Sequence, residues 1–108
     1  MNRDDPKIAI ALDKIRSVRG TEEGEYSTDL FVSLHLEELD EQVLRSMLGG
    51  EIPTSQNLLD ALVFVGAWSS KDDGAVDVYD FSLPDDVSQY LLSVRFEGDV
   101  PISVAMES

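Results

Sequence analysis

The stretch VDVYDFSL, residues 76–83, decides the fold, because its residues alternate with the period of two that is typical of a β-strand. A turn at residues 84–86 follows, and the alternation returns in YLLSVRF, residues 90–96. The second stretch has an apolar face and a mixed face: Leu92, Val94 and Phe96 against Leu91, Ser93 and Arg95. We therefore predict two strands here.

A third strand closes this part of the chain. The short glycine-containing segment at residues 97–99 predicts a hairpin reversal, and Ile102, Val104 and Met106 alternate after it. Pro101 stands where the closing strand begins, which is typical of an edge strand or a strand start.

The chain begins with a predicted amphipathic helix that Gly20 ends. Asp5 is the expected N-cap, Pro6 the first helical residue, and the apolar residues recur at helical spacing: Ile8, Leu12, Ile15 and Val18. Residues 1–19 carry five basic and three acidic side chains in a chain with a net charge of −14. We expect this helix to offset the acidic body intramolecularly, and the alternative is a membrane or partner anchor.

The next segments predict a polar loop, a strand and a helix. The loop at residues 21–26 carries Glu22, Glu23 and Glu25, and residues 30–36 then alternate as in a strand, with His35 on its partly exposed face. Residues 37–50 predict a helix that the pair Gly49-Gly50 ends.

A mostly apolar segment, residues 54–68, predicts a central helix capped by Thr54 or Ser55, although its β-branched latter part could instead be a strand. The fold class that follows is α+β, one domain over residues 1–108. We expect a mostly antiparallel sheet of about four strands with helices packed on one face.

Composition excludes several kinds of function. The chain has 22 acidic and 8 basic residues, no cysteine and one histidine, so it has no disulfides, no thiolate sites and no site that needs two histidines. The acidity disfavours nucleic acid and anionic membranes as partners. No signal peptide or membrane span is visible, and we expect a soluble, cytoplasmic protein.

No enzyme motif stands out, and we predict neither catalysis nor a cofactor. The acidic run at residues 72–86 lacks the spacing of a calcium loop, and Asp77 and Asp80 fall on opposite strand faces. Too few aromatic residues accompany the carboxylates for a glycosidase. Serine-hydrolase and phosphate-loop patterns are absent from the sequence, and no spacing places His35 in a catalytic group.

The remaining signal is the negative charge, which would speed association with a cationic protein. The candidate binding residues are the first-loop acids and an aromatic with the acids around the 76–83 strand: Glu22, Glu23, Glu25, Trp68, Asp72, Asp73, Asp77 and Asp80. In the alternatives, acidity serves solubility only, Trp68 belongs to the core, and the chain self-associates through residues 63–65 or its closing edge strand.

The C-terminal segments 78–84, 90–99 and 102–108, about the last 30 residues, carry a resemblance. With their strand, turn and Met-Glu-Ser ending they resemble the tail of small, uncharacterised bacterial proteins of a domain-of-unknown-function family. Some members of such families are associated with toxin systems as candidate immunity proteins. The resemblance therefore implies an immunity-type inhibitor of a basic toxin domain, and it implies no catalytic position.

Overall fold

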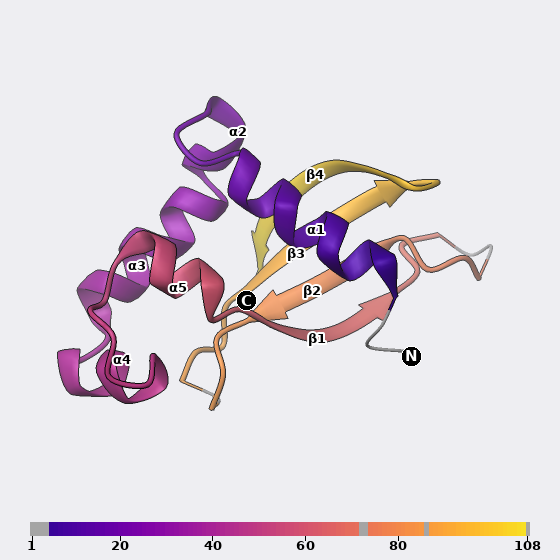
Figure 1. Ribbon diagram of the computed structural model, residues 1–108. Coiled ribbons are helices and arrows are strands. Elements are labelled where there is room, and N and C mark those ends of the chain that lie inside the picture. Colours follow the sequence, from indigo (N-terminus) through magenta and orange to yellow (C-terminus); the bar gives the residue numbers. More distant parts are fainter. Residues whose placement is uncertain (1–4, 72–73, 86, 108) are drawn as a thin grey trace.

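The computed structural model describes residues 5–71, 74–85 and 87–107, and it confirms the α+β class (Figure 1). The elements in chain order are α1 (Pro6–Ser17), α2 (Glu22–Glu25), α3 (Thr28–Glu38), α4 (Glu41–Met47), α5 (Ser55–Asp60), β1 (Val63–Trp68), β2 (Val78–Ser82), β3 (Leu91–Glu97) and β4 (Val100–Glu107).

The four strands form an antiparallel sheet in the order β1-β2-β3-β4, so each strand pairs with its neighbour in the sequence. The predicted hairpin between β3 and β4 is confirmed, with Gly98 at φ 64° in its turn. That left-handed conformation is readily adopted by glycine. A β-bulge interrupts the pairing of β1 with β2 between Phe64 and Gly66.

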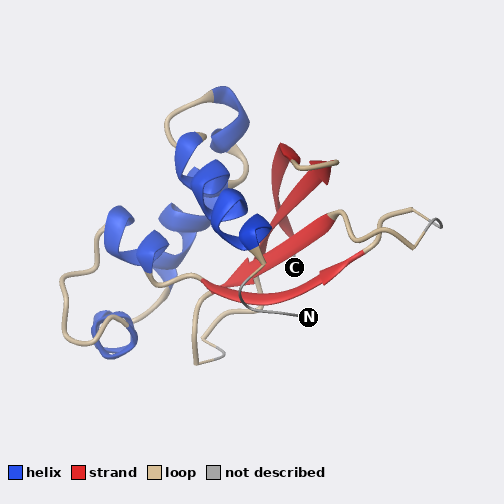
Figure 2. Ribbon diagram, turned by 45° about the vertical axis from the view of Figure 1, so that its right-hand side comes forward, coloured by secondary structure: helices blue, strands red, loops and turns tan. Residues whose placement is uncertain are grey.

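The helices lie on one side of the sheet, as predicted, and the described residues place none on the other (Figure 2). The core fills the space between α1, α3, α5 and the covered face of the sheet. Its largest fully buried side chains come from both layers: Ile15, Phe31, Leu58 and Leu59 from the helices, and Phe81, Leu92 and Val94 from the sheet.

Helix α1 forms as the sequence predicts. The Asp5 carboxylate caps it by accepting a hydrogen bond from the Lys7 backbone N–H at 2.9 Å. Its basic side chains pair within the molecule: Lys7 with Asp99 at 3.8 Å, Lys14 with Glu23 at 3.7 Å and Arg16 with Asp60 at 3.4 Å. These pairs agree with the intramolecular interpretation for Lys7, Lys14 and Arg16, and Arg3 lies outside the described residues. No helix in the described ranges is long and apolar enough to cross a bilayer.

The predicted strand over residues 30–36 is wrong, because this segment belongs to α3. Burial within the helix falls at Thr28, Phe31, Val32 and His35, which is a spacing of three and four. The apparent alternation arose because leucines also occupy positions that are only partly buried. His35 consequently lies in the interior with 2% exposure, not on a partly exposed sheet face.

Two further segments, residues 21–26 and 37–50, differ from the prediction. The polar loop at residues 21–26 contains α2, which Thr21 caps. The predicted helix over residues 37–50 breaks at Leu39, whose backbone is extended, and Asp40 caps a separate helix, α4.

The predicted helix over residues 54–68 ends at Asp60, and β1 follows, so the strand alternative holds for its latter part. Val63 and Val65 are β-branched, which favours a strand there. The sheet has the expected four strands because β1 takes the place of the strand wrongly predicted over residues 30–36.

Candidate functional site

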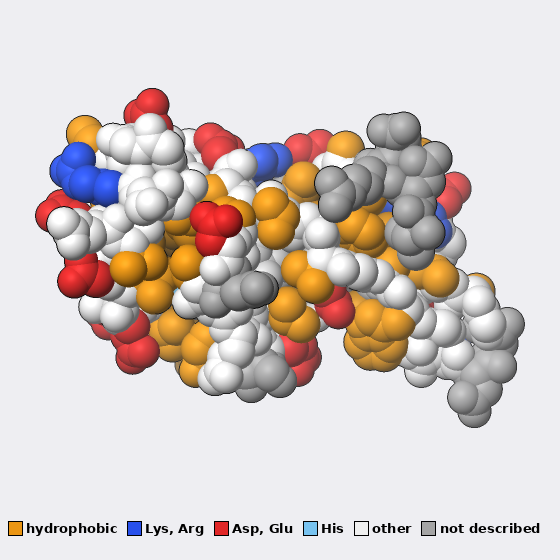
Figure 3. Space-filling view, turned by 90° about the horizontal axis from the view of Figure 1, so that it is seen from below, with side chains coloured by type: hydrophobic (Ala, Val, Ile, Leu, Met, Phe, Trp, Pro, Cys, Tyr) orange, Lys and Arg blue, Asp and Glu red, His pale blue; other side chains and the backbone are white. Residues whose placement is uncertain are grey.

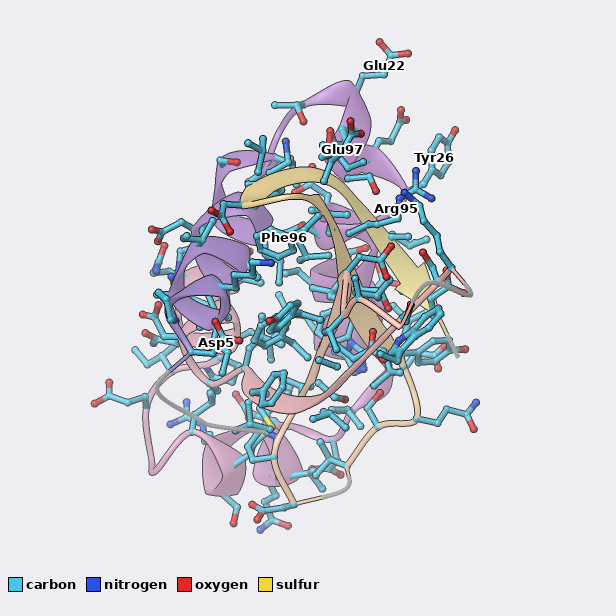
Figure 4. All side chains as sticks on the ribbon, turned by 90° about the vertical axis from the view of Figure 1, so that its right-hand side faces the viewer. Asp5, Glu22, Tyr26, Arg95, Phe96 and Glu97 are labelled. Carbon is cyan, nitrogen blue, oxygen red and sulfur yellow. The ribbon has the colours of Figure 1, made fainter. Side chains whose placement is uncertain are left out.

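The sheet has one covered face and one open face. On β3, Phe96 points toward α1 and the core, whereas its neighbour Arg95 points to the opposite side (Figure 4). The strand pairing aligns the residues of the open face in rows across the sheet. One row is Trp68, Val78, Arg95 and Ser103, and the next is Gly66, Asp80, Ser93 and Ala105.

The open face holds a shallow hollow of about 420 Å³. Its lining comes from all four strands and from the loop after β1: Trp68, Ser70, Val78, Asp80, Leu91, Ser93, Arg95, Ser103, Ala105 and Glu107. The hollow thus combines a tryptophan and an arginine, two residue types that are enriched at protein-binding surfaces, with small and acidic side chains.

Asp80 lies near the middle of this hollow and is held from both sides. The Trp68 indole Nε1–H donates to its Oδ2 at 3.0 Å, and the Ser93 hydroxyl donates to its Oδ1 at 2.6 Å. These bonds link three neighbouring strands through one carboxylate. Trp68 keeps 49% of its surface exposed, so the indole is an anchored surface side chain and not part of the core.

The loop after β1 is fastened beside the hollow by Asp77. Its carboxylate accepts hydrogen bonds from the Ser70 backbone N–H at 2.7 Å and from the Ser70 hydroxyl at 2.5 Å. The hydroxyl bond, followed by the backbone bond, lowers the pKa of Asp77. Asp77 therefore stays ionised and positions Ser70, which lines the hollow.

The candidate acids do not form one surface. Trp68 and Asp80 line the hollow, whereas Asp77 precedes β2 and lines a separate depression with Lys7 and Phe96. Glu22, Glu23 and Glu25 belong to α2, which lies beside β4 at the other edge of the sheet. Four strands span about 14 Å at roughly 4.8 Å per spacing. Figure 4 shows Glu22 at the outer tip of α2. Asp72 and Asp73 lie outside the described residues.

Of the residues that line the hollow, only Trp68 and Asp80 were selected from the sequence. The other lining residues were not selected: Ser70, Val78, Leu91, Ser93, Arg95, Ser103, Ala105 and Glu107. The alternation of residues 90–96 had placed Ser93 and Arg95 on the mixed face of their strand, so it did indicate that they share the face opposite the core. The pairing register of β2 with β3 that sets them beside Asp80 was not visible, because alternation indicates the face of a residue and not its partner on the next strand.

His35 forms a second polar group that the sequence did not reveal. Its Nδ1 lies 2.6 Å from the Phe31 carbonyl oxygen, which can only accept, so Nδ1 carries the proton. Nε2 then accepts from the Ser88 hydroxyl at 2.6 Å. Ser88 also accepts the Tyr90 backbone N–H at 3.0 Å.

The His35 ring packs against Phe31 and Tyr90, with centroids at 4.3 and 5.9 Å. Both ring nitrogens are therefore engaged within the fold, and the group ties α3 to the connection between β2 and β3. We interpret it as a structural link.

Among the residues that the structure describes, no three or more His, Asp or Glu side chains gather as metal ligands would. Comparison with protein-family models, curated proteins and solved structures finds no match for the chain. The resemblance of its C-terminal segments to a bacterial family thus stays a prediction.

Proposed function

We propose that this chain is a non-enzymatic module that binds a cationic protein through its open face. The observation that carries the proposal is a sheet face without a helix over it in the described residues, with a half-exposed tryptophan anchored at its hollow. Helices cover the other face, so the uncovered face is the part of the sheet on which a partner could dock.

The net charge of the chain indicates the sign of the charge that its partner should carry. A net charge of −14 favours encounter with a positively charged protein by roughly 10–10³-fold at low salt. Within the hollow, Asp80 and Glu107 outnumber Arg95. In its most specific form, the proposal is an immunity-type inhibitor whose acidic surface blocks a basic bacterial toxin domain, as the C-terminal resemblance implies.

The test is affinity capture from a lysate of the source cells with three forms of the chain. Ala105→Arg adds a bulky positive group to the exposed second row of the open face, and Gln42→Arg adds the same charge to exposed α4. We expect the unaltered chain and Gln42→Arg to retain one cationic protein that salt weakens, and Ala105→Arg to lose it. Equal retention by both variants would remove the open face from the proposal.

An alternative is a homo-oligomer formed through β1, with acidity serving solubility. The observation that favours it is the free edge of this strand, where Val63 is 41% and Val65 is 56% exposed. Figure 3 views the molecule from the β1 side and shows hydrophobic side chains running across its middle. The bulge between Phe64 and Gly66 disfavours edge pairing, because it breaks the regular ladder.

Sedimentation separates the two proposals. A chain that runs as a dimer, and that Val65→Lys converts to a monomer, would support the alternative. A monomer that captures a cationic protein would support the open face.

A further inference from the structure

We propose that the hollow of the open face takes an arginine side chain of the protein partner, an inference that rests on the function proposed above. The guanidinium would pair with the Asp80 carboxylate and lie against the indole of Trp68.

The Asp80 carboxylate is oriented but not saturated. A carboxylate offers about four lone-pair positions, and Trp68 and Ser93 occupy one on each oxygen. Among the described residues, one acceptor position on each oxygen therefore remains for a further donor. A planar guanidinium presents two parallel N–H groups, which matches two carboxylate oxygens of fixed direction.

Trp68 supplies a surface for the same group. Its hydrogen bond to Asp80 fixes the ring by its Nε1 edge while 49% of the side chain stays exposed. Cations bind favourably over the face of an indole, and arginine does so more often than lysine. One side chain could therefore contact the carboxylate and the aromatic ring together.

Gly66 keeps the β1 side of Asp80 open. It pairs with Asp80 across the sheet and precedes Trp68 by two residues. A Cβ at this position would meet nothing within 4 Å, so the space directly over Gly66, next to the Trp68 ring that bonds Asp80, is open. A partner side chain can approach Asp80 here without displacing the fold.

Arg95 is a resident cation in the same hollow and should compete with the incoming one. It pairs across the sheet with Val78, which places it diagonally from Asp80, about 7–8 Å away between Cα atoms. Arg95 forms no ion pair within the described residues. Removing its charge should therefore strengthen binding of an arginine probe.

The experiment uses the peptides acetyl-Gly-Arg-Gly-amide and acetyl-Gly-Lys-Gly-amide at equal ionic strength. Trp68 is the only tryptophan of the chain, so its fluorescence and its single indole N–H resonance report directly on the hollow. We expect saturable changes with the arginine peptide at lower concentration than with the lysine peptide. Equal responses to the two peptides, or no saturation, would overturn the proposal.

Three variants sharpen the test. Asp80→Asn should weaken binding of the arginine peptide by about tenfold or more, because the charged acceptor is lost. Arg95→Gln should tighten it severalfold. Glu51→Gln removes the same charge from an exposed loop before α5 and should change nothing. Unchanged affinity in Asp80→Asn would overturn the assignment of the carboxylate.

Failure of the arginine pocket can be told apart from failure of the open face as the docking surface. If Ala105→Arg abolishes capture of the cationic protein while the arginine peptide fails to bind, the open face stands and the arginine pocket is wrong. If the arginine peptide binds with the expected variant pattern but capture is insensitive to Ala105→Arg, the pocket stands and the proposed docking surface is wrong.

Discussion

His35 is the only histidine of the chain, and the fold encloses it with both ring nitrogens hydrogen-bonded. Burial lowers the pKa of His35 below its usual range, against smaller opposing effects of the Phe31 carbonyl and the Glu38 carboxylate. The folded state thus favours the neutral ring. This contribution to stability is present above about pH 6.5 and declines as the pH falls through the pKa of the folded state.

Replacing Ser88 should change the pKa of His35. In Ser88→Ala the hydroxyl that donates to Nε2 of the neutral ring is lost, so the pKa of His35 should rise toward its ordinary value. The variant should also lose about 1–3 kcal/mol of unfolding free energy, because a buried acceptor is left unpaired. NMR titration of the single histidine and urea denaturation measure the two effects.

Ser33→Ala is the matched control for Ser88. It removes an exposed hydroxyl that, within the described part of the chain, donates to the Leu30 carbonyl of the same helix. The pKa of His35 should stay unchanged in this variant. An unaltered chain in which His35 titrates at or above pH 6.5 would contradict the burial of the ring.

At the scale of elements, the junction between α1 and α2 depends on Gly24. A Cβ on this residue would lie 2.0 Å from the Val18 carbonyl oxygen and 2.8 Å from its carbon. Both are backbone atoms, so the two segments would have to separate. We expect Gly24→Ala to lower the free energy of unfolding by about 1–3 kcal/mol, as overpacking does elsewhere.

Gly66→Ala is the comparison, since its added Cβ meets open space and its backbone is not in the left-handed region. It should leave the free energy of unfolding unchanged or raise it by about 0.5 kcal/mol, because alanine lowers the conformational entropy of the unfolded chain. Urea denaturation of both variants checks the contrast. Equal stability of the two variants would show that α2 does not pack against the end of α1.

The elements that the sequence predicts well are those with a local chemical signal. Asp5 and Pro6 mark the start of α1, and the alternation at residues 76–83 and 90–96 marks two strands. The helix predicted as a strand and the strand predicted as a helix fall where the apolar residues are too dense for periodicity to decide, at residues 30–36 and 54–68.

The hollow depends on residues 54–68, which contain β1. Trp68 and Asp80 were selected from the sequence as single residues, but their hydrogen bond requires β1 to pair with β2. A helix through residue 68 gives no such pairing. The contact between His35 and Ser88, which are 53 residues apart, was likewise beyond any local pattern.

At the scale of the whole molecule, the net charge of −14 lies on a body with a radius of gyration of 13.8 Å. The ion pairs of α1 are short, between 3.4 and 3.8 Å, whereas most repulsion between carboxylates acts over longer distances. The Debye length falls from about 30 Å at 0.01 M salt to about 10 Å at 0.1 M. Added salt should therefore remove more repulsion than attraction.

We accordingly expect the melting temperature at pH 7 to rise by several degrees between about 0.01 and 0.1 M salt, since roughly 1 kcal/mol corresponds to about 4–8 °C in a small domain. Sodium chloride and sodium perchlorate should act alike if screening is the cause. Near the sequence pI of about 4.1 the rise should vanish, because the net repulsion is gone.

The same salt range should slow association with a cationic partner, because the field that repels the chain's own carboxylates attracts that partner. Calorimetry of the free chain and stopped-flow mixing with the partner would follow the two trends side by side. A melting temperature that falls with salt at pH 7 would mean that the α1 ion pairs outweigh the repulsion. Repulsion from the net charge would then contribute less to stability than the local ion pairs do, and the effect of the charge on a partner would rest on the association rate alone.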